Sequence, residues 1–244
     1  MAVLHCSGMD RTLKSTICDK LSKILQCNVY HFDKPKDLED GKQQYFNFLN
    51  ETYKTNDIIC DRYHDGEHVY APLYRGYESN YLKEFELQLR KYPYLFINTT
   101  ADIDVILERI KLAGEDFVKE EHYQTVLDLF ERYVEKQSMP YIKIDTSAAE
   151  VDKYIERILN ATDKIKRMYE YAVKNGCQNI YYGNMEADNF IIVDKDKLEL
   201  VKQMLIQNKT YNNFWITTNE DSDFVDYQMR LLQPEEIIIY GGNK

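Results

Sequence analysis

The residues with the clearest chemical meaning lie near the start of the chain, in the segment GMDRTLKST at 8–16. At every position but one, this segment matches the pattern of a phosphate-binding loop, in which Gly, four residues, Gly and Lys precede a Ser or Thr. Backbone N–H groups of such a loop point at phosphate oxygens. Lys14 would reach the β- and γ-phosphates of ATP, and Ser15 would place a hydroxyl on Mg²⁺. The predicted cofactor-binding residues are Gly8, Lys14, Ser15 and Thr16.

Leu13 stands where the pattern has its second Gly. That Gly normally supplies permissive backbone geometry at the entry to the helix. We expect Leu13 to have an ordinary helical φ, with its side chain directed away from the phosphates, and we expect Lys14 to be exposed. The alternative is a degenerate loop in which Leu13 blocks the phosphate cradle.

The elements that must position this loop can be predicted from hydrophobic patterns. Short apolar runs predict buried strands at residues 2–7, 57–60, 95–97 and 141–144. Helical spacing predicts helices at residues 14–26, 37–54, 78–91, 102–112, 122–137 and 148–160. Strands that alternate with helices indicate an α/β fold with a parallel sheet flanked by helices. Ligands of such sheets bind beyond the carboxyl ends of the strands, where Gly8 and Asp61 both fall.

The pattern changes after about residue 162, which divides the chain into a phosphate-loop domain at 1–161 and a small α+β appendage at 162–244. A charged helix is expected at 163–174, ending at Asn175-Gly176. The runs QNIYYG and NFIIVD are expected to pair as a hairpin around residues 184–188. A helix at 195–207 and the runs FWITT (214–218) and EIIIYGG (236–242) follow. No motif indicates what the appendage does.

Composition narrows the classes of partner. The chain has 41 acidic and 31 basic residues, a net charge of −10, which argues against a polymeric nucleic acid partner. No apolar run resembles a signal peptide or a membrane span. The five cysteines are scattered without CxxC spacing, so neither a disulfide framework nor a zinc site is indicated. We therefore expect a cytoplasmic protein with reduced cysteines.

Two motifs together carry a resemblance to a known family. The segment from Gly8 to Thr16 resembles the GxDRTGKTT loop of one class of thymidylate kinases, and CDRY at 60–63 resembles their DRY/DRH motif. Weaker likenesses are the strand at 95–97 with DVILER at 104–109, and KIDT at 143–146. The likeness covers residues 1–160, and phage-encoded deoxynucleotide kinases are similar too. The implied fold is a P-loop kinase-type parallel sheet flanked by helices, with the C-terminal α+β appendage added.

The resemblance implies roles on the acceptor side of the site. Asp10 would lie near the sugar 3′-hydroxyl of the acceptor nucleotide, and Arg62 would grip its monophosphate. Arg75 is carried over as a second contact to the phosphate or the base. Aromatic residues between Tyr63 and Tyr77 are candidates for stacking on the base, with packing as the alternative.

The resemblance also implies a catalytic set and a metal site. Arg11 would stabilise charge on the transferring phosphoryl group, together with Lys14. Asp61 would orient Mg²⁺-bound water or Arg62, and Ser15 and Asp61 would be the Mg²⁺ ligands. In this class the loop carries the arginine and the lid lacks one. The lid region at 112–124 contains no Arg, as that class requires.

The implied function is ATP-dependent phosphoryl transfer to a deoxynucleoside monophosphate, either dTMP or a related pyrimidine nucleotide. Thymidylate kinases are usually homodimers, so a homodimer is a candidate assembly. One alternative is a deoxynucleoside kinase with Asp61 as the general base. A second is a degenerate P-loop protein that binds a nucleotide or a partner without catalysis, for which Leu13 and the appendage are the motivation.

Overall fold

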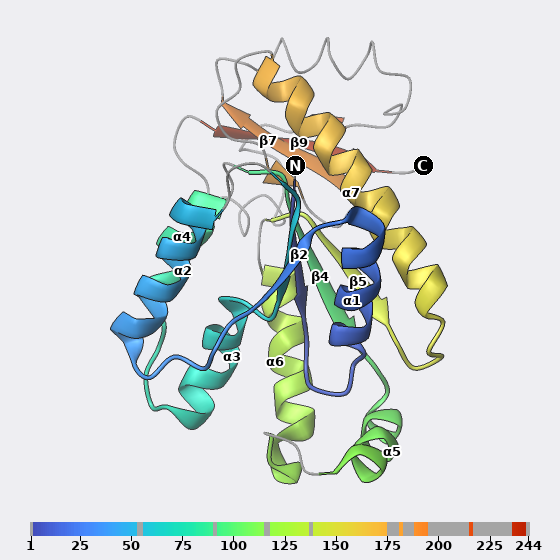
Figure 1. Ribbon diagram of the computed structural model, residues 1–244. Helices are drawn as coiled ribbons and strands as arrows, with labels where there is room; N and C mark the ends of the chain where they lie inside the picture. The colour runs from blue at the N-terminus through green and yellow to red at the C-terminus, as the bar shows by residue number, and fades with distance from the viewer. Residues whose placement is uncertain are drawn as a thin grey trace.

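The centre of the fold consists of short apolar segments buried as parallel strands. The computed structural model describes residues 2–52, 56–89, 92–114, 118–136, 139–174, 181–182, 188–194, 215–216 and 236–242. Five strands form an all-parallel sheet in the order β2-β3-β1-β4-β5 (Figure 1). They are β1 (Val3–Ser7), β2 (Asn28–His31), β3 (Ile58–Asp61), β4 (Tyr94–Thr100) and β5 (Tyr141–Asp145).

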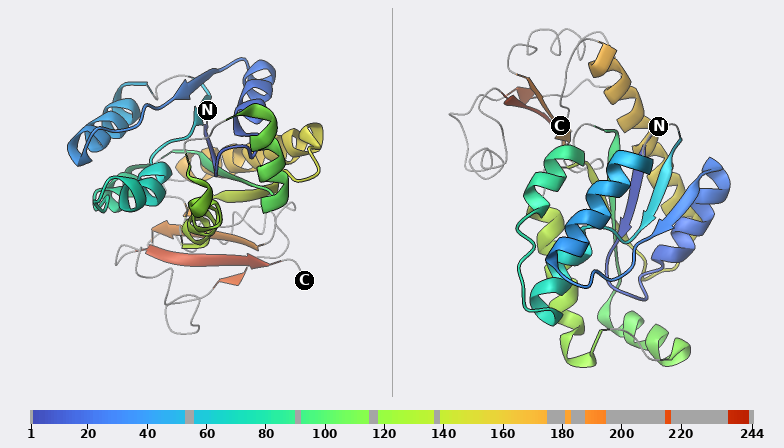
Figure 2. Two further views of the ribbon diagram at one scale, coloured as in Figure 1. Left: turned by 90° about the horizontal axis from the view of Figure 1, so that it is seen from below. Right: turned by 60° about the vertical axis from the view of Figure 1, so that its left-hand side comes forward.

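Helices cover both faces of this sheet (Figures 1 and 2). On one face lie α1 (Lys14–Leu25) and α7 (Val151–Lys174). On the other lie α2 (Leu38–Thr52), α4 (Leu82–Leu89) and α6 (Tyr123–Lys136). Beyond the carboxyl ends of the strands lie α3 (Asp65–Tyr74), α5 (Ile103–Ala113) and the 3-10 turn η1 (Glu120–His122).

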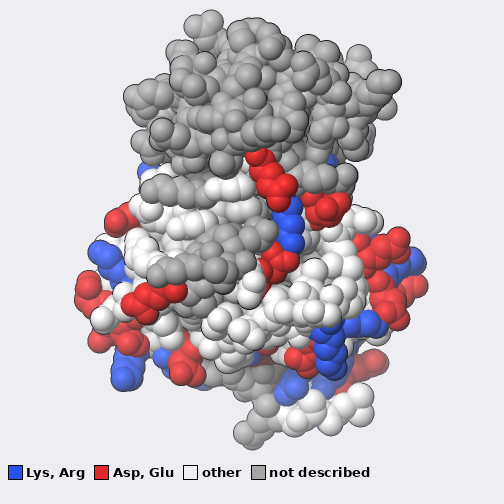
Figure 3. Space-filling model, turned by 45° about the horizontal axis from the view of Figure 1, so that its top comes forward, with Lys and Arg blue, Asp and Glu red and all other residues white. Residues whose placement is uncertain are grey.

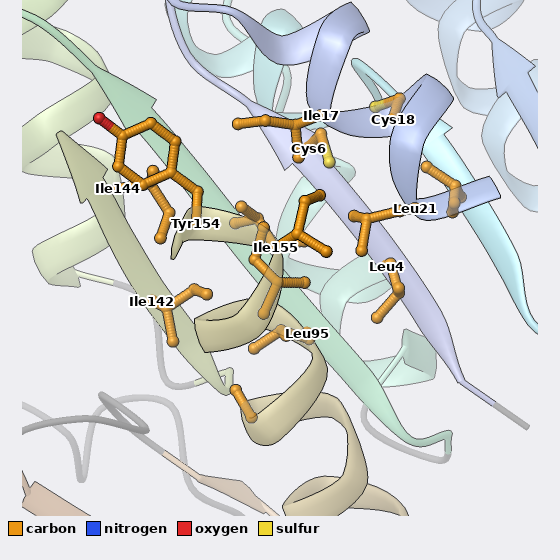
Figure 4. Packing of buried hydrophobic residues seen from close by; sticks show 14 of the residues in the cluster. Leu4, Cys6, Ile17, Cys18, Leu21, Leu95, Ile142, Ile144, Tyr154 and Ile155 are labelled. Atoms are coloured by element: carbon orange, nitrogen blue, oxygen red, sulfur yellow. The ribbon is translucent and has the colours of Figure 1, made fainter. Parts of the chain in front are cut away.

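Alternation along β1 assigns its side chains to two cores. Leu4 and Cys6 pack toward α1 and α7 with Ile17, Leu21 and Ile155 (Figure 4). Val3 packs into the opposite core, which aromatic residues from α2, α4 and α6 fill. Buried side chains from both cores pack against β1, so its end is held from both sides where the phosphate loop begins.

Four of the five strands were predicted, and β2 was not. The segment Asn28–His31 has no apolar run because it is an edge strand whose residues are mostly exposed. The helix α3 was also absent from the pattern-based prediction. The two helices expected at 148–160 and 163–174 are one helix, α7. Its buried stripe continues through Ile158, Ala161 and Ile165, so the helical pattern does not break at the predicted domain boundary.

The described residues of the C-terminal region form a second sheet. Its strands are β6 (Tyr181–Tyr182), β7 (Asp188–Asp194), β8 (Trp215–Ile216) and β9 (Glu236–Gly242), in the antiparallel order β6-β7-β9-β8. The expected hairpin pairing of QNIYYG with NFIIVD is confirmed, since β6 pairs with β7. In Figures 1 and 2, β7 and β9 lie at the opposite end of the molecule from α5. The expected helix at 195–207 lies outside the described residues, and the division at 161/162 remains a prediction.

The surface of the described residues carries both signs of charge. On the face drawn in Figure 3, Lys and Arg side chains are interspersed with Asp and Glu. Within the described part of the chain, no helix combines the length and the hydropathy needed to cross a membrane.

Candidate active site

Gly8 brings the phosphate loop into direct contact with the end of β4. Its φ is 124°, and a Cβ atom at this position would lie 2.0 Å from the backbone oxygen of Thr99. The Thr99 hydroxyl donates to the Ser7 carbonyl at 2.8 Å, and its oxygen lies 2.7 Å from the Thr12 hydroxyl oxygen. Only glycine fits here, and the loop is consequently fixed against a second strand.

Lys14 is buried, contrary to the expectation that it would be exposed. Its side chain is 5% exposed, and Nζ donates to the Met9 carbonyl at 2.5 Å. The Asp10 carboxylate lies 3.7 Å from the same ammonium. Burial lowers the pKa of Lys14, and Asp10 opposes that shift. The Lys14 ammonium therefore lies inside the phosphate loop, where a phosphate group would stabilise its charge.

The expected helical φ of Leu13 is also wrong. Leu13 has φ 61° and ψ 16°, in the left-handed region, and Arg11 has φ 66°. A left-handed conformation costs a residue with a Cβ atom on the order of 1–2 kcal/mol. Leu13 therefore adopts a backbone conformation that favours glycine, although it carries a side chain. Leu13 is half-buried and lines the pocket at the phosphate loop.

Ser15 and Asp61, the two predicted Mg²⁺ ligands, lie side by side. The Ser15 hydroxyl donates to Asp61 Oδ2 at 2.8 Å, which joins the start of α1 to the end of β3. Asp61 Oδ1 is buried and has no hydrogen-bond partner within the described residues. Those residues include no cluster of three or more His, Cys, Asp or Glu side chains that could hold a metal. One hydroxyl and one carboxylate nevertheless fit Mg²⁺, which usually binds few protein oxygens and retains waters and phosphate oxygens.

Arg62 and Asp10 lie where two pockets meet. Arg62 follows β3 with φ 65°, and its guanidinium forms an ion pair with the Asp10 carboxylate. Both residues line a pocket of about 480 Å³ beside the phosphate loop. Both also line a second pocket of about 180 Å³ beside α3. We call these the phosphate pocket and the aromatic pocket.

The aromatic pocket has a wall of rings and a set of ionisable groups. Its aromatic residues are Phe32, Tyr45, Tyr63, Tyr70 and Phe130. Tyr63 and Tyr70 were among the candidates for stacking. Aromatic walls with a few fixed polar groups are typical of sites that bind flat organic ligands.

Arg75 lies in the aromatic pocket and is held by Glu67. The guanidinium forms an ion pair with the Glu67 carboxylate, which also accepts a 2.8 Å hydrogen bond from the Tyr77 hydroxyl. Burial raises the pKa of Glu67, while Tyr77 and Arg75 act in the opposite direction. Arg75 lines the aromatic pocket and does not line the phosphate pocket.

A buried polar network under the aromatic pocket was missed by sequence reasoning. Ser7 donates to the Asp65 carboxylate, whose other oxygen lies 2.7 Å from His5 Nε2. His5 Nδ1 lies 2.5 Å from the Tyr94 hydroxyl. Burial by itself raises the pKa of Asp65, but His5 and Ser7 together lower it by more, so the net shift of the pKa is downward. A histidine within the apolar run of β1 was the only available signal.

Arg109 is part of the DVILER segment, and its contacts could not be predicted from the sequence. Its guanidinium donates to the Arg11 carbonyl at 2.9 Å and to the Thr146 carbonyl at 2.6 Å. Arg109 lines the phosphate pocket beside Arg11.

The sheet order and the phosphate loop after β1 define a P-loop kinase-like α/β fold. No family model matches the sequence. The chain is 22% identical over 163 residues to the SPbeta prophage-derived uncharacterized protein YorR of Bacillus subtilis (strain 168), a match that covers 65% of this chain and 98% of YorR.

Solved structures support the same fold. The crystal structure of YorR in complex with phosphorylated GDP has a TM-score of 0.57 at 21% identity, covering 66% of this chain and 95% of that chain. Polyphosphate kinase 2 from Arthrobacter aurescens TC1 has a TM-score of 0.51 at 13% identity, covering 68% of each chain. Each match leaves about a third of this chain without a counterpart.

The backbone of Leu13 generates a stability prediction. Leu13→Gly should be more stable than Leu13→Ala by about 1 kcal/mol, because Gly adopts a φ of 61° without a Cβ clash. Urea unfolding of both variants measures the difference. The same pair of substitutions at exposed Asp19, inside α1, is the control, and there Ala should be the more stable by roughly 0.5–1 kcal/mol. A more stable Ala variant at position 13 would contradict the left-handed backbone.

Asp65 generates a prediction about pH. Because its folded-state pKa is lowered, its carboxylate contributes stability above the ordinary Asp value near 4, and that contribution is lost as the pH falls through the folded value. Between about pH 5 and pH 3, the free energy of unfolding should fall less steeply for Asp65→Asn than for the wild type. Denaturant unfolding across this range measures both slopes, with exposed Asp104→Asn as the control. Parallel curves for Asp65→Asn and the wild type would show that the network does not stabilise the ionised form.

Proposed function

We propose that this protein transfers the γ-phosphoryl group of ATP to a deoxynucleoside monophosphate, either dTMP or a related pyrimidine nucleotide. One observation carries the proposal. Asp10 and Arg62 line both the phosphate pocket and the aromatic pocket, so a donor phosphate and an acceptor phosphate would meet at one arginine. Phosphoryl transfer depends mainly on such positioning and on stabilisation of charge.

The donor side uses the phosphate loop. Gly8, Lys14, Ser15 and Thr16 bind the phosphates of ATP, and Ser15 and Asp61 hold Mg²⁺. Bound Mg²⁺ neutralises charge on the β- and γ-phosphate oxygens. Arg11 lines the phosphate pocket and acts on the charge that develops on the transferring group.

The acceptor side uses the aromatic pocket. Arg62 grips the acceptor phosphate, Asp10 receives the sugar 3′-hydroxyl, and Arg75 contacts the base. A monophosphate is already ionised and needs cations, whereas a nucleoside needs a general base. Asp61, the candidate base, hydrogen-bonds Ser15 and lines neither pocket.

A screen of acceptors tests the proposal directly. ATP consumption is measured with Mg²⁺ across dTMP, other deoxynucleoside monophosphates, modified pyrimidine monophosphates and nucleosides. Because YorR was solved with phosphorylated GDP, guanine nucleotides belong in the panel. Turnover with a pyrimidine monophosphate, and its loss in Lys14→Ala, supports the proposal. Turnover with nucleosides alone would assign a nucleoside kinase, and no turnover with any acceptor would reject both.

Leu13 favours a second candidate, a nucleotide-binding protein without catalysis. Its side chain lines the phosphate pocket at the entry to α1. Calorimetric titration of the wild type and Leu13→Gly with ATP separates the two functions. A large gain of affinity on restoring Gly would support the non-catalytic function, whereas unchanged or weaker binding would support a working kinase.

Arg11→Ala should lower kcat far more than it raises the KM for ATP. Loss of an arginine that acts on transition-state charge costs on the order of 10³–10⁵ in rate. Steady-state kinetics with the best acceptor from the screen measures both constants. A change confined to KM would make Arg11 a ground-state binder and would remove it from the catalytic set.

A further inference from the structure

Arg109 connects the helix before the lid region to the phosphate loop. It lies on α5, and its Nη1 donates to the backbone carbonyl of Arg11 at 2.9 Å and to the Thr146 hydroxyl at 3.2 Å. Its Nη2 donates to the Thr146 carbonyl at 2.6 Å. One planar guanidinium therefore holds two backbone segments in a fixed relation, which a single ammonium cannot do.

The segment on the far side of this clamp is rigid. Thr146 is fully buried and follows β5. Its N–H and its hydroxyl both donate to the Thr100 carbonyl at the end of β4, each at 2.8 Å. Arg109 thus links the backbone of Arg11 to a segment that is fixed at the edge of the central sheet.

The segment on the near side is strained. Arg11 has a φ of 66°, a conformation that a residue with a Cβ atom keeps only when its surroundings hold it. The neighbouring carbonyl of Met9 is also occupied, by the Thr12 hydroxyl at 2.7 Å and by Lys14 Nζ at 2.5 Å. Arg109 donates directly to the carbonyl of Arg11.

We propose that Arg109 is a positioning residue for Arg11. The Arg109 guanidinium fixes the left-handed backbone of the loop and thereby places the Arg11 side chain in the phosphate pocket. The inference rests on the proposed phosphoryl transfer for its kinetic consequence. The physical role is separate from that function, because it concerns the conformation of the loop.

A double-mutant cycle with Arg11→Ala, Arg109→Gln and the combined variant tests the kinetic consequence. Arg109→Gln should lower kcat by about 10- to 100-fold, since small misplacements of a catalytic group have effects of that order. The KM for ATP should change by less than about 3-fold. In the Arg11→Ala background, Arg109→Gln should have less than about a 2-fold effect on kcat, because the group that it positions is gone. An equal loss in both backgrounds, or a large rise in KM, would overturn the inference and make Arg109 a direct contact of the nucleotide.

Two further variants separate geometry from charge and from fold. Arg109→Lys keeps the positive charge but cannot reach both carbonyls, so it should behave like Arg109→Gln, and wild-type kcat in Arg109→Lys would overturn the inference. Lys111→Gln removes an exposed charge two residues along α5 and should leave kcat unchanged.

Amide hydrogen exchange tests the loop conformation independently of activity. Arg109→Gln and Arg109→Lys should accelerate exchange at residues 10–14 by at least about 10-fold, while Lys111→Gln should not. If the wild type phosphorylates no acceptor, the proposed function fails and the exchange result still decides this inference. Unchanged exchange at residues 10–14 in both Arg109 variants would overturn it.

Discussion

At Gly8 the phosphate loop passes directly against the end of β4. Because a single carbon added at Gly8 would meet the Thr99 backbone, the loop leaves β1 along one path only. Hydroxyls of Thr12 and Thr99 fix that path. The burial of Lys14 and the left-handed backbone of Leu13 follow from it, since both residues lie on the turn that must bring the chain back to α1. The site is thus built on the sheet, and the charged side chains occupy positions that the backbone has already set.

Much of the fold could be predicted from sequence because it depends on local patterns. Apolar runs located the strands on both sides of the site, and the ends of two of them placed Gly8 and Asp61 at the same edge of the sheet. The edge strand β2 escaped because exposed residues such as Asn28 carry no apolar signal. The helix α7 was divided because its polar residues obscured a buried stripe that runs through Ala161.

The interior of the site could not be predicted, for physical reasons. Whether Lys14 is buried, and which φ Leu13 adopts, depends on contact with residues about ninety positions away in β4. The partners of Arg109 are backbone carbonyls, which every residue possesses and no motif marks. His5 and Asp65 meet because β1 and the start of α3 are neighbours in space, and nothing in their spacing along the chain indicates it.

Asp10 gives the site an internal counter-ion. Its carboxylate pairs with Arg62 and lies 3.7 Å from the Lys14 ammonium, so much of their positive field is cancelled within the protein. An entering anion must compete with a carboxylate that is already in place and has no entropy of translation to lose. A singly charged anion such as chloride gains little from that exchange, whereas a group with two charges gains more from each cation that it reaches. On this argument chloride should compete poorly for Arg62 and Lys14, and an anion with two charges should compete better.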